Sequence, residues 1–145
     1  MLSKVERFWI AFNLRFAFGF LFLFASLNMF SYGPEKFATD LSKPFESTWL
    51  WTIQGDQTFV GDFILWFLYA TPFVMGALSV PILTGIFAKP ALRLGAFVLI
   101  CFGLGKYIQN DIATTAADFT LALIIWLGLY LLGTESREHA GEISS

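Results

Sequence analysis

Arg15 is the first residue of this chain whose type and position could do chemistry. It lies inside an apolar stretch, seven residues beyond Phe8, and a helical rise of about 1.5 Å per residue puts it roughly 10 Å into the helix. A charge at that depth needs a partner or a route to the lipid headgroups. Two interpretations stay open: it extends to the cytoplasmic surface, beside Glu6 or a lipid phosphate, or it faces the helix bundle and binds an anion or a quinone carbonyl.

A second set of polar residues lies toward the opposite membrane surface. Lys106 ends one apolar stretch and Asp118 lies about one turn into the next, so an ion pair between them is possible. Asn28 and Asp62 should reach the same level from two other helices. The set predicts a structural clasp or a site for a ligand or a proton, although Asp62 and Asp118 show no spacing typical of an acid and base pair. The candidate contacts of a quinone or anion are Arg15, Asn28, Lys106 and Asp118.

Ligands for a metal or a redox cofactor are scarce. The only histidine, His139, lies in a polar C-terminal segment, and the only cysteine, Cys101, lies alone in an apolar stretch. We therefore do not expect this chain alone to hold a histidine-ligated haem, an iron–sulfur cluster, a metal ion or a disulfide. Cys101 is predicted to be a small buried apolar side chain. No catalytic residue is predicted, and the sequence favours no enzymatic activity for the chain on its own.

Helices that cross a membrane must position these residues. Of the 145 residues 57% are hydrophobic and 14% are charged, and the mean hydropathy is +0.67, values outside the range of soluble globular proteins. About 20 apolar residues cross the hydrocarbon core as a helix. Four stretches approach or exceed that length: Phe8–Phe30, Phe59–Phe87, Ala91–Lys106 and Thr114–Gly133. The predicted fold is all-α, a polytopic four-helix transmembrane bundle, with a polar tail over 134–145.

Local signals add detail to this bundle. Pro72 and Pro81 should kink the second helix. The aromatic-rich loop of 31–58 should form a short helix that Pro44 ends. This helix should lie on the membrane surface or dip into it, with Trp49 and Trp51 at headgroup depth. Small residues suit close helix contacts, among them the Ala91-x-x-x-Gly95 pair; the set is Gly19, Gly76, Ala91, Gly95, Gly103, Gly105 and Gly128.

The distribution of Lys and Arg predicts the orientation in the membrane. Six lie on one side and three on the other, which favours both termini in the cytoplasm and the aromatic loop outside it, in a prokaryotic cytoplasmic membrane. The six are Lys4, Arg7, Arg15, Lys89, Arg93 and Arg137, and the three are Lys36, Lys43 and Lys106. A net charge of −2 without a basic run gives no reason to expect nucleic acid as a partner.

Several short motifs resemble the DoxX/DoxD-like family of small membrane proteins. They are Leu14-Arg15 in 14–22, Gly76-Ala77-Leu78, Leu83-Thr84-Gly85 in 83–91, 102–107, Asn110-Asp111, Asp118-Phe119 and Leu129-Tyr130-Leu131. The resemblance implies a four-helix membrane bundle and, as the best-known activity, the membrane part of a thiosulfate:quinone oxidoreductase. Two positions depart from the family pattern: Asp118 stands where Asn is expected, and the end of the first helix lacks Gly-x-x-Lys and reads Ser26-Leu27-Asn28-Met29.

The sequence therefore predicts an accessory subunit of a larger respiratory or photosynthetic electron-transfer complex. Such a subunit packs against other membrane subunits and lipid, and holds a quinone, lipid or pigment at a helix surface. Two alternatives stay open. One is a quinone-reactive subunit of a thiosulfate:quinone oxidoreductase-like enzyme, and the other is a small solute carrier that uses the kink between Pro72 and Pro81.

Overall fold

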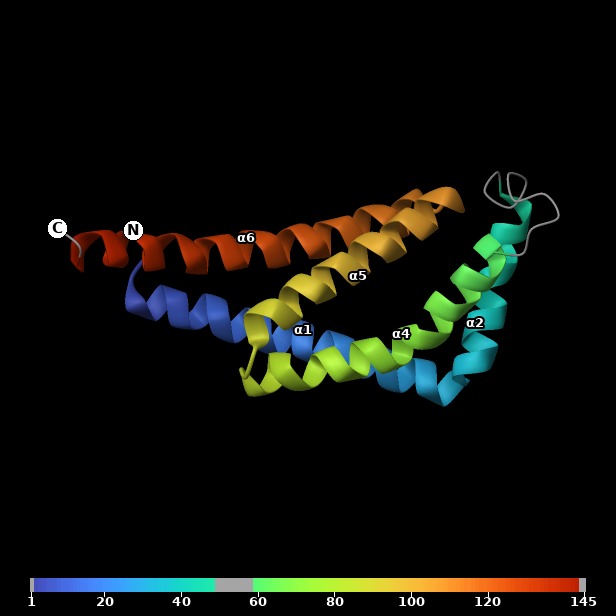
Figure 1. Ribbon diagram of the computed structural model, residues 1–145, viewed down its shortest axis with the longest axis horizontal. Coiled ribbons are helices and arrows are strands. Elements are labelled where there is room, and N and C mark those ends of the chain that lie inside the picture. Colours follow the sequence, from blue (N-terminus) through green and yellow to red (C-terminus); the bar gives the residue numbers. More distant parts are fainter. Residues whose placement is uncertain (1, 49–58, 144–145) are drawn as a thin grey trace.

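The computed structural model describes residues 2–48 and 59–143, and every regular element in these ranges is a helix (Figure 1). The predicted Trp49 and Trp51 at headgroup depth lie outside the described residues. Four of the helices are long and apolar enough to cross a membrane: α1 (Lys4–Tyr32), α4 (Phe59–Thr84), α5 (Ala88–Ile108) and the first part of α6 (Ile112–Ile143), over Ile112–Gly133. The all-helical fold class and the four long apolar helices are confirmed.

Each long helix starts or ends where a local signal dictates. α1 begins before the predicted Phe8 because Ser3 and Glu6 form a capping box, in which each side chain accepts a hydrogen bond from the other residue's amide. It ends at Gly33, whose φ of 100° an L side chain rarely adopts, and Pro34 follows as the first residue of the next helix.

The loop after α1 forms the expected short helix. α2 spans Pro34–Ser42 and continues as a 3-10 turn, η1 (Lys43–Ser47), which contains Pro44. α2 packs along the first part of α4 (Figure 1). Phe45 in η1 is buried, and Gly105 of α5 lies close to its ring. α2 and η1 are therefore packed parts of the protein, folded onto two of the long helices.

α4 contains both prolines in its interior and bends along its length (Figure 1). A proline lacks an N–H and leaves a carbonyl one turn earlier without its helical partner. Nearby hydroxyls bond to carbonyls within the same helix, since Thr71 donates to Phe67 and Ser79 donates to Gly76. α4 ends at Thr84, three residues before the predicted end, because Gly85 and Phe87 both adopt a positive φ in the turn.

α5 and α6 extend beyond their predicted ends. α5 covers Ala88–Ile108 instead of 91–106, and α6 starts at Ile112 because Asp111 accepts hydrogen bonds from the amide and hydroxyl of Thr114. The helical backbone of α6 continues to Ile143, where the sequence predicted a polar tail. Glu, Arg and Ala in this segment favour helix, and no proline interrupts it.

The four long helices form two close pairs, α1 with α4 and α5 with α6, and the two chain ends lie at the same end of the molecule (Figure 1). Their core includes Phe22, Ile82 and Ile125, which are fully buried. Gly95 of α5 lets the Phe22 ring of α1 approach so closely that an added Cβ would lie 2.4 Å from its Cε2. The predicted small-residue contact at Ala91 and Gly95 is confirmed, since both are buried in this core.

Candidate functional site

An apolar groove lies between η1, α4 and α5, with a volume of about 570 Å³. Phenylalanine rings make up much of its wall, and the rings of Phe67 and Phe102 pack together with their centroids 5.8 Å apart. The lining residues are Leu41, Phe45, Val60, Phe63, Ile64, Phe67, Leu68, Phe97, Cys101, Phe102, Leu104, Gly105, Lys106, Ile108 and Gln109. A groove of this size and composition suits a flat or elongated apolar molecule.

Lys106 and Gln109 are the two polar side chains among these lining residues. Lys106 lies in the last turn of α5, where the partial negative charge of the helix end favours a cation. Its Nζ donates to Oε1 of Gln109 over 3.5 Å, and both residues are half-buried. An ammonium and an amide at the end of an apolar groove can donate hydrogen bonds to a carbonyl or an anionic group of a bound amphiphile.

Cys101 also lines this groove and is half-buried. The sequence prediction of a small apolar side chain agrees with its neighbours, but the thiol borders a cavity instead of being enclosed in the core. Modification of its thiol can therefore report on a molecule bound in the groove, because the chain contains no second cysteine.

The predicted polar cluster does not form in the part of the chain that the structure describes. No ion pair joins Lys106 to Asp118, and Asn28 and Asp62 are exposed. Asp118 is half-buried against Gly103. The residue that links α6 to α5 at this level is Thr115, whose buried hydroxyl donates to the carbonyls of Gly103 and Asp111. A hydroxyl makes this contact without the desolvation that two buried charges would require.

Arg15 faces the bundle, at the opposite end of α5 from Lys106. Its Nε donates to the carbonyl of Ile82 over 3.3 Å, and its Nη2 donates to that of Leu83 over 3.0 Å. These carbonyls belong to the last turn of α4, which lacks helical partners for them. An added Cβ on Gly85 would lie 2.6 Å from Nη2, so a larger residue there would displace the guanidinium, and the φ of 81° independently favours glycine. The side chain also borders a second cavity, of about 400 Å³.

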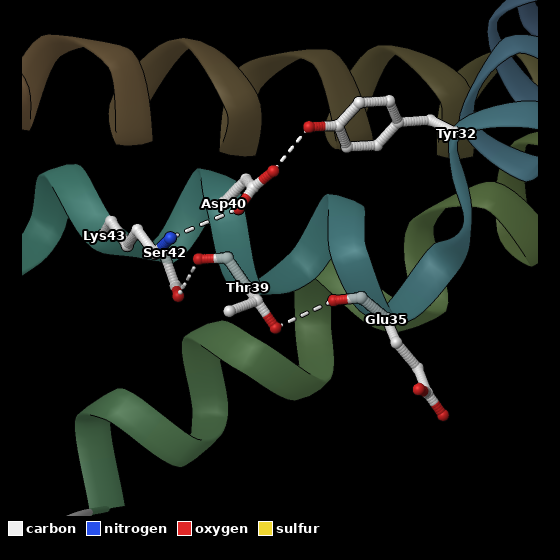
Figure 2. Close-up of polar contacts among 6 residues, drawn as sticks. All are labelled: Tyr32, Glu35, Thr39, Asp40, Ser42 and Lys43. Atoms are coloured by element: carbon white, nitrogen blue, oxygen red, sulfur yellow. Dashed lines mark hydrogen bonds and ion pairs between the residues drawn. The ribbon is translucent and has the colours of Figure 1, made fainter.

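A polar corner joins α1 to α2 and holds the loop beside the groove (Figure 2). The Tyr32 hydroxyl at the end of α1 donates to Asp40 of α2, and Lys43 approaches the other carboxylate oxygen at 3.4 Å. The hydrogen bond from Tyr32, followed by the one from Lys43 and the charges of Lys43 and Lys36, holds the pKa of Asp40 below its usual value. No sequence pattern predicted this corner, although the Gly33-Pro34 turn brings the two helices together.

A second contact that the sequence analysis missed joins α1 to α4. The buried hydroxyl of Ser26 donates to the carbonyl of Pro72 over 2.7 Å. Gly76, one turn further along α4, leaves room for this side chain, since an added Cβ there would lie 2.8 Å from Ser26 Oγ. The sequence signal was present in a small hydroxyl residue within an apolar helix, a type that often bonds across membrane helices.

Comparisons with known proteins identify no relative of this chain. No protein-family model matches it, and neither a curated protein nor a solved structure does. The resemblance to the DoxX/DoxD-like family therefore stays a prediction that depends on the short motifs alone.

Proposed function

We propose that this protein is an integral membrane accessory subunit of an electron-transfer complex and that its groove binds a quinone-class amphiphile. The observation that carries this proposal is the groove itself, whose described lining combines phenylalanine walls with one cation and one amide. A quinone has a flat ring, two carbonyl acceptors and an apolar tail, and each of these finds a complementary feature there.

Lys106 and Gln109 supply the polar contacts in this proposal. The Lys106 ammonium donates a hydrogen bond to one quinone carbonyl, and the Gln109 amide supports the lysine or donates a second bond. The ring lies against the walls near Phe67 and Phe102, where aromatic faces favour offset or edge contacts. Asn28 is exposed, and neither it nor Asp118 lines the groove, so the proposed contacts narrow to Lys106 and Gln109.

The accessory role is supported by the scarcity of residues that could hold a redox centre. Its sequence has one cysteine and one histidine, and the described residues contain no group of acidic, His and Cys side chains that could hold a metal. Electrons for a bound quinone would therefore come from a partner subunit. Exposed aromatic side chains along α1 provide apolar surface for lipid and for partner helices.

The proposed orientation places both termini in the cytoplasm of a prokaryotic cell. The two chain ends and the α4–α5 turn lie toward one end of the bundle, and α2 lies toward the other (Figure 1). The larger group of Lys and Arg residues, the six that the sequence places on one side, then lies on the cytoplasmic side. In this orientation the groove opens toward the outer leaflet, beside the aromatic loop.

The DoxX/DoxD-like resemblance supports a second form of the proposal, in which this chain is the quinone-reactive subunit of a thiosulfate:quinone oxidoreductase-like enzyme. Lys106 is the specific observation that favours it, because a cation beside a quinone carbonyl also stabilises the anionic reduced form. Both forms of the proposal place a quinone in the same groove. They differ in whether the bound quinone is reduced there.

Protection of Cys101 from alkylation tests the groove directly. In detergent-solubilised protein, a fully ring-substituted benzoquinone with a decyl tail should slow modification of Cys101 by N-ethylmaleimide, as measured by intact mass. Lys106→Met should weaken the protection about tenfold, because the carbonyl loses its charged donor. Lys4→Met removes an exposed lysine remote from the groove and should leave it unchanged.

A displaced cysteine provides the matched control. Leu94 is exposed on the same helix and does not line the groove. In Cys101→Ala/Leu94→Cys protein, the quinone should not protect the new thiol. Equal protection at both positions would mean that the quinone only partitions into the micelle, and the groove would lose its assignment.

Purification from the native membrane in mild detergent tests the accessory role separately. Recovery within a complex that carries redox cofactors supports it. Recovery of the chain alone with stoichiometric quinone would contradict the accessory role and favour a protein that reacts with quinone by itself.

A further inference from the structure

The second cavity, of about 400 Å³, lies at the other end of the bundle from Lys106, where α1, the α4–α5 turn and α6 meet. Its lining residues come from separate parts of the sequence: Ala11, Leu14, Arg15, Gly85, Phe87, Ala88, Lys89, Pro90, Leu92, Leu129 and Leu132. Arg15 and Lys89 are cations, and none of the described residues that line the cavity is a carboxylate. Electrostatically the cavity therefore favours an anion.

Arg15 is held in place without using all of its donors. Nε and one N–H of Nη2 bond to the α4 carbonyls. A guanidinium has five N–H groups, so three remain for a ligand. The residue is half-buried, which strengthens its attraction for an anion compared with a fully exposed arginine. Because the two carbonyl bonds fix the plane of the guanidinium, little side-chain entropy is lost on binding.

The start of α5 borders the same cavity. Phe87 caps this helix without a side-chain hydrogen bond, and Ala88 and Lys89 are its first residues. The first amides of a helix have no partners within it, and the helix dipole favours negative charge near them. These amides add to the attraction that the two cations exert on an anion. By themselves they would not make an anion site.

The remaining walls are apolar. Leu14, Leu92, Leu129 and Leu132 line the cavity beside the cations. The exposed Ile86 and Phe87 form the tip of the neighbouring turn, as expected for a turn at the surface of a membrane. A ligand that fits both kinds of wall has an anionic phosphate and an aliphatic chain.

We propose that this cavity binds the phosphate and the adjoining acyl chain of an anionic phospholipid from the leaflet on the side of the chain termini. The phosphate lies between Arg15 and Lys89, near the first amides of α5, and the acyl chain lies against the leucines. The bound lipid thereby joins α1, the α4–α5 turn and α6. This site is separate from the groove and does not depend on the proposed quinone.

Thermal unfolding in a neutral detergent, with and without added phosphatidylglycerol, tests this site. Phosphatidylglycerol should raise the melting temperature more than phosphatidylcholine does, and native mass spectrometry should retain one phosphatidylglycerol per chain. Lys89→Gln should weaken binding about fivefold, since it removes one of the two cations. The matched control is Arg93→Gln, which removes an exposed charge from the next turn of α5 outside the cavity and should change binding little.

A second test reduces the volume of the cavity without changing its charge. Ala11 borders the cavity and Ala17, on the same helix, does not. Ala11→Phe should displace the lipid while Ala17→Phe retains it. Equal weakening by Lys89→Gln and Arg93→Gln would show diffuse attraction to the anionic surface and overturn the site. An equal shift in melting temperature with inorganic phosphate alone would assign the cavity to a free anion and overturn the lipid.

Discussion

Arg15 holds the end of α4 through two carbonyls that the helix itself cannot satisfy. Arg15→Met removes both donors, so we expect the free energy of unfolding to fall by about 1–3 kcal/mol. Arg15→Lys should recover only part of the loss, because one ammonium does not reproduce the planar fork of a guanidinium. Unfolding in mixed micelles, followed by circular dichroism, measures both. Unchanged unfolding of Arg15→Met would show that the carbonyl bonds do not contribute to stability.

Gly95 of α5 and Phe22 of α1 are in close contact, and an added Cβ on Gly95 would meet the ring at 2.4 and 2.7 Å. Phe22 is fully buried. Gly95→Ala should therefore destabilise the protein by about 1–3 kcal/mol through overpacking. Phe22→Leu in the same chain should relieve part of that loss, so the double variant should be less destabilised than the sum of the two single variants. Additive losses of unfolding free energy in the same mixed-micelle assay would mean that the added methyl group and the Phe22 ring do not clash.

Among the elements, α2 is the one whose docking we expect to depend on the charge of Asp40. Its folded-state pKa lies below the ordinary value because Tyr32 and Lys43 bond to the carboxylate. The contribution to stability is therefore present above the unfolded pKa of about 4 and is lost as the pH falls through the lower folded pKa. We expect α2 amides to exchange hydrogen faster with solvent, relative to those of α5, once the pH falls below that range.

Two variants isolate this corner. Tyr32→Phe removes the main hydrogen bond, so it should return the pKa of Asp40 toward its ordinary value and loosen α2 at a higher pH. Glu35 lies on the same short helix, and its carboxylate points away from the corner (Figure 2). Glu35→Gln should leave the pH dependence of α2 exchange unchanged. The same loosening in both variants would rule out a specific role for Asp40.

For the whole molecule, the four candidate membrane helices predict that both termini lie on one side of the membrane. Single cysteines in a Cys101→Ala background test this with a membrane-impermeant maleimide on intact cells. Ser47, on the loop after α2, is exposed, as are Ser3 and Lys89 near the other end. Ser47→Cys should react in intact cells, whereas Ser3→Cys and Lys89→Cys should react only after permeabilisation. Reaction of Ser3→Cys and Ser47→Cys from the same side would contradict the four-span topology.

Hydropathy, helix length and terminal signals act locally, so the helices could be predicted from the amino-acid sequence alone. The four apolar stretches and the short helix that starts after Gly33 were predictable, since each depends on residues within a few turns of one another. The small residues at Ala91 and Gly95 indicated a close helix contact, but the ring that Gly95 meets, Phe22, belongs to another helix. The helix ends differed by a few residues where local hydrogen bonds, such as those of Ser3 and Asp111, extend a helix.

Which polar residues meet depends on how the helices pack, and the sequence did not reveal it. Lys106 and Asp118 are close along the chain but form no ion pair, whereas Arg15 meets carbonyls about 67 residues away. Likewise, Lys106 and Phe45 border one groove and Arg15 and Lys89 border one cavity because helix packing brings them together. Hydropathy specifies that a helix is buried in a membrane, but the direction in which each side chain points depends on how helices rotate against their neighbours.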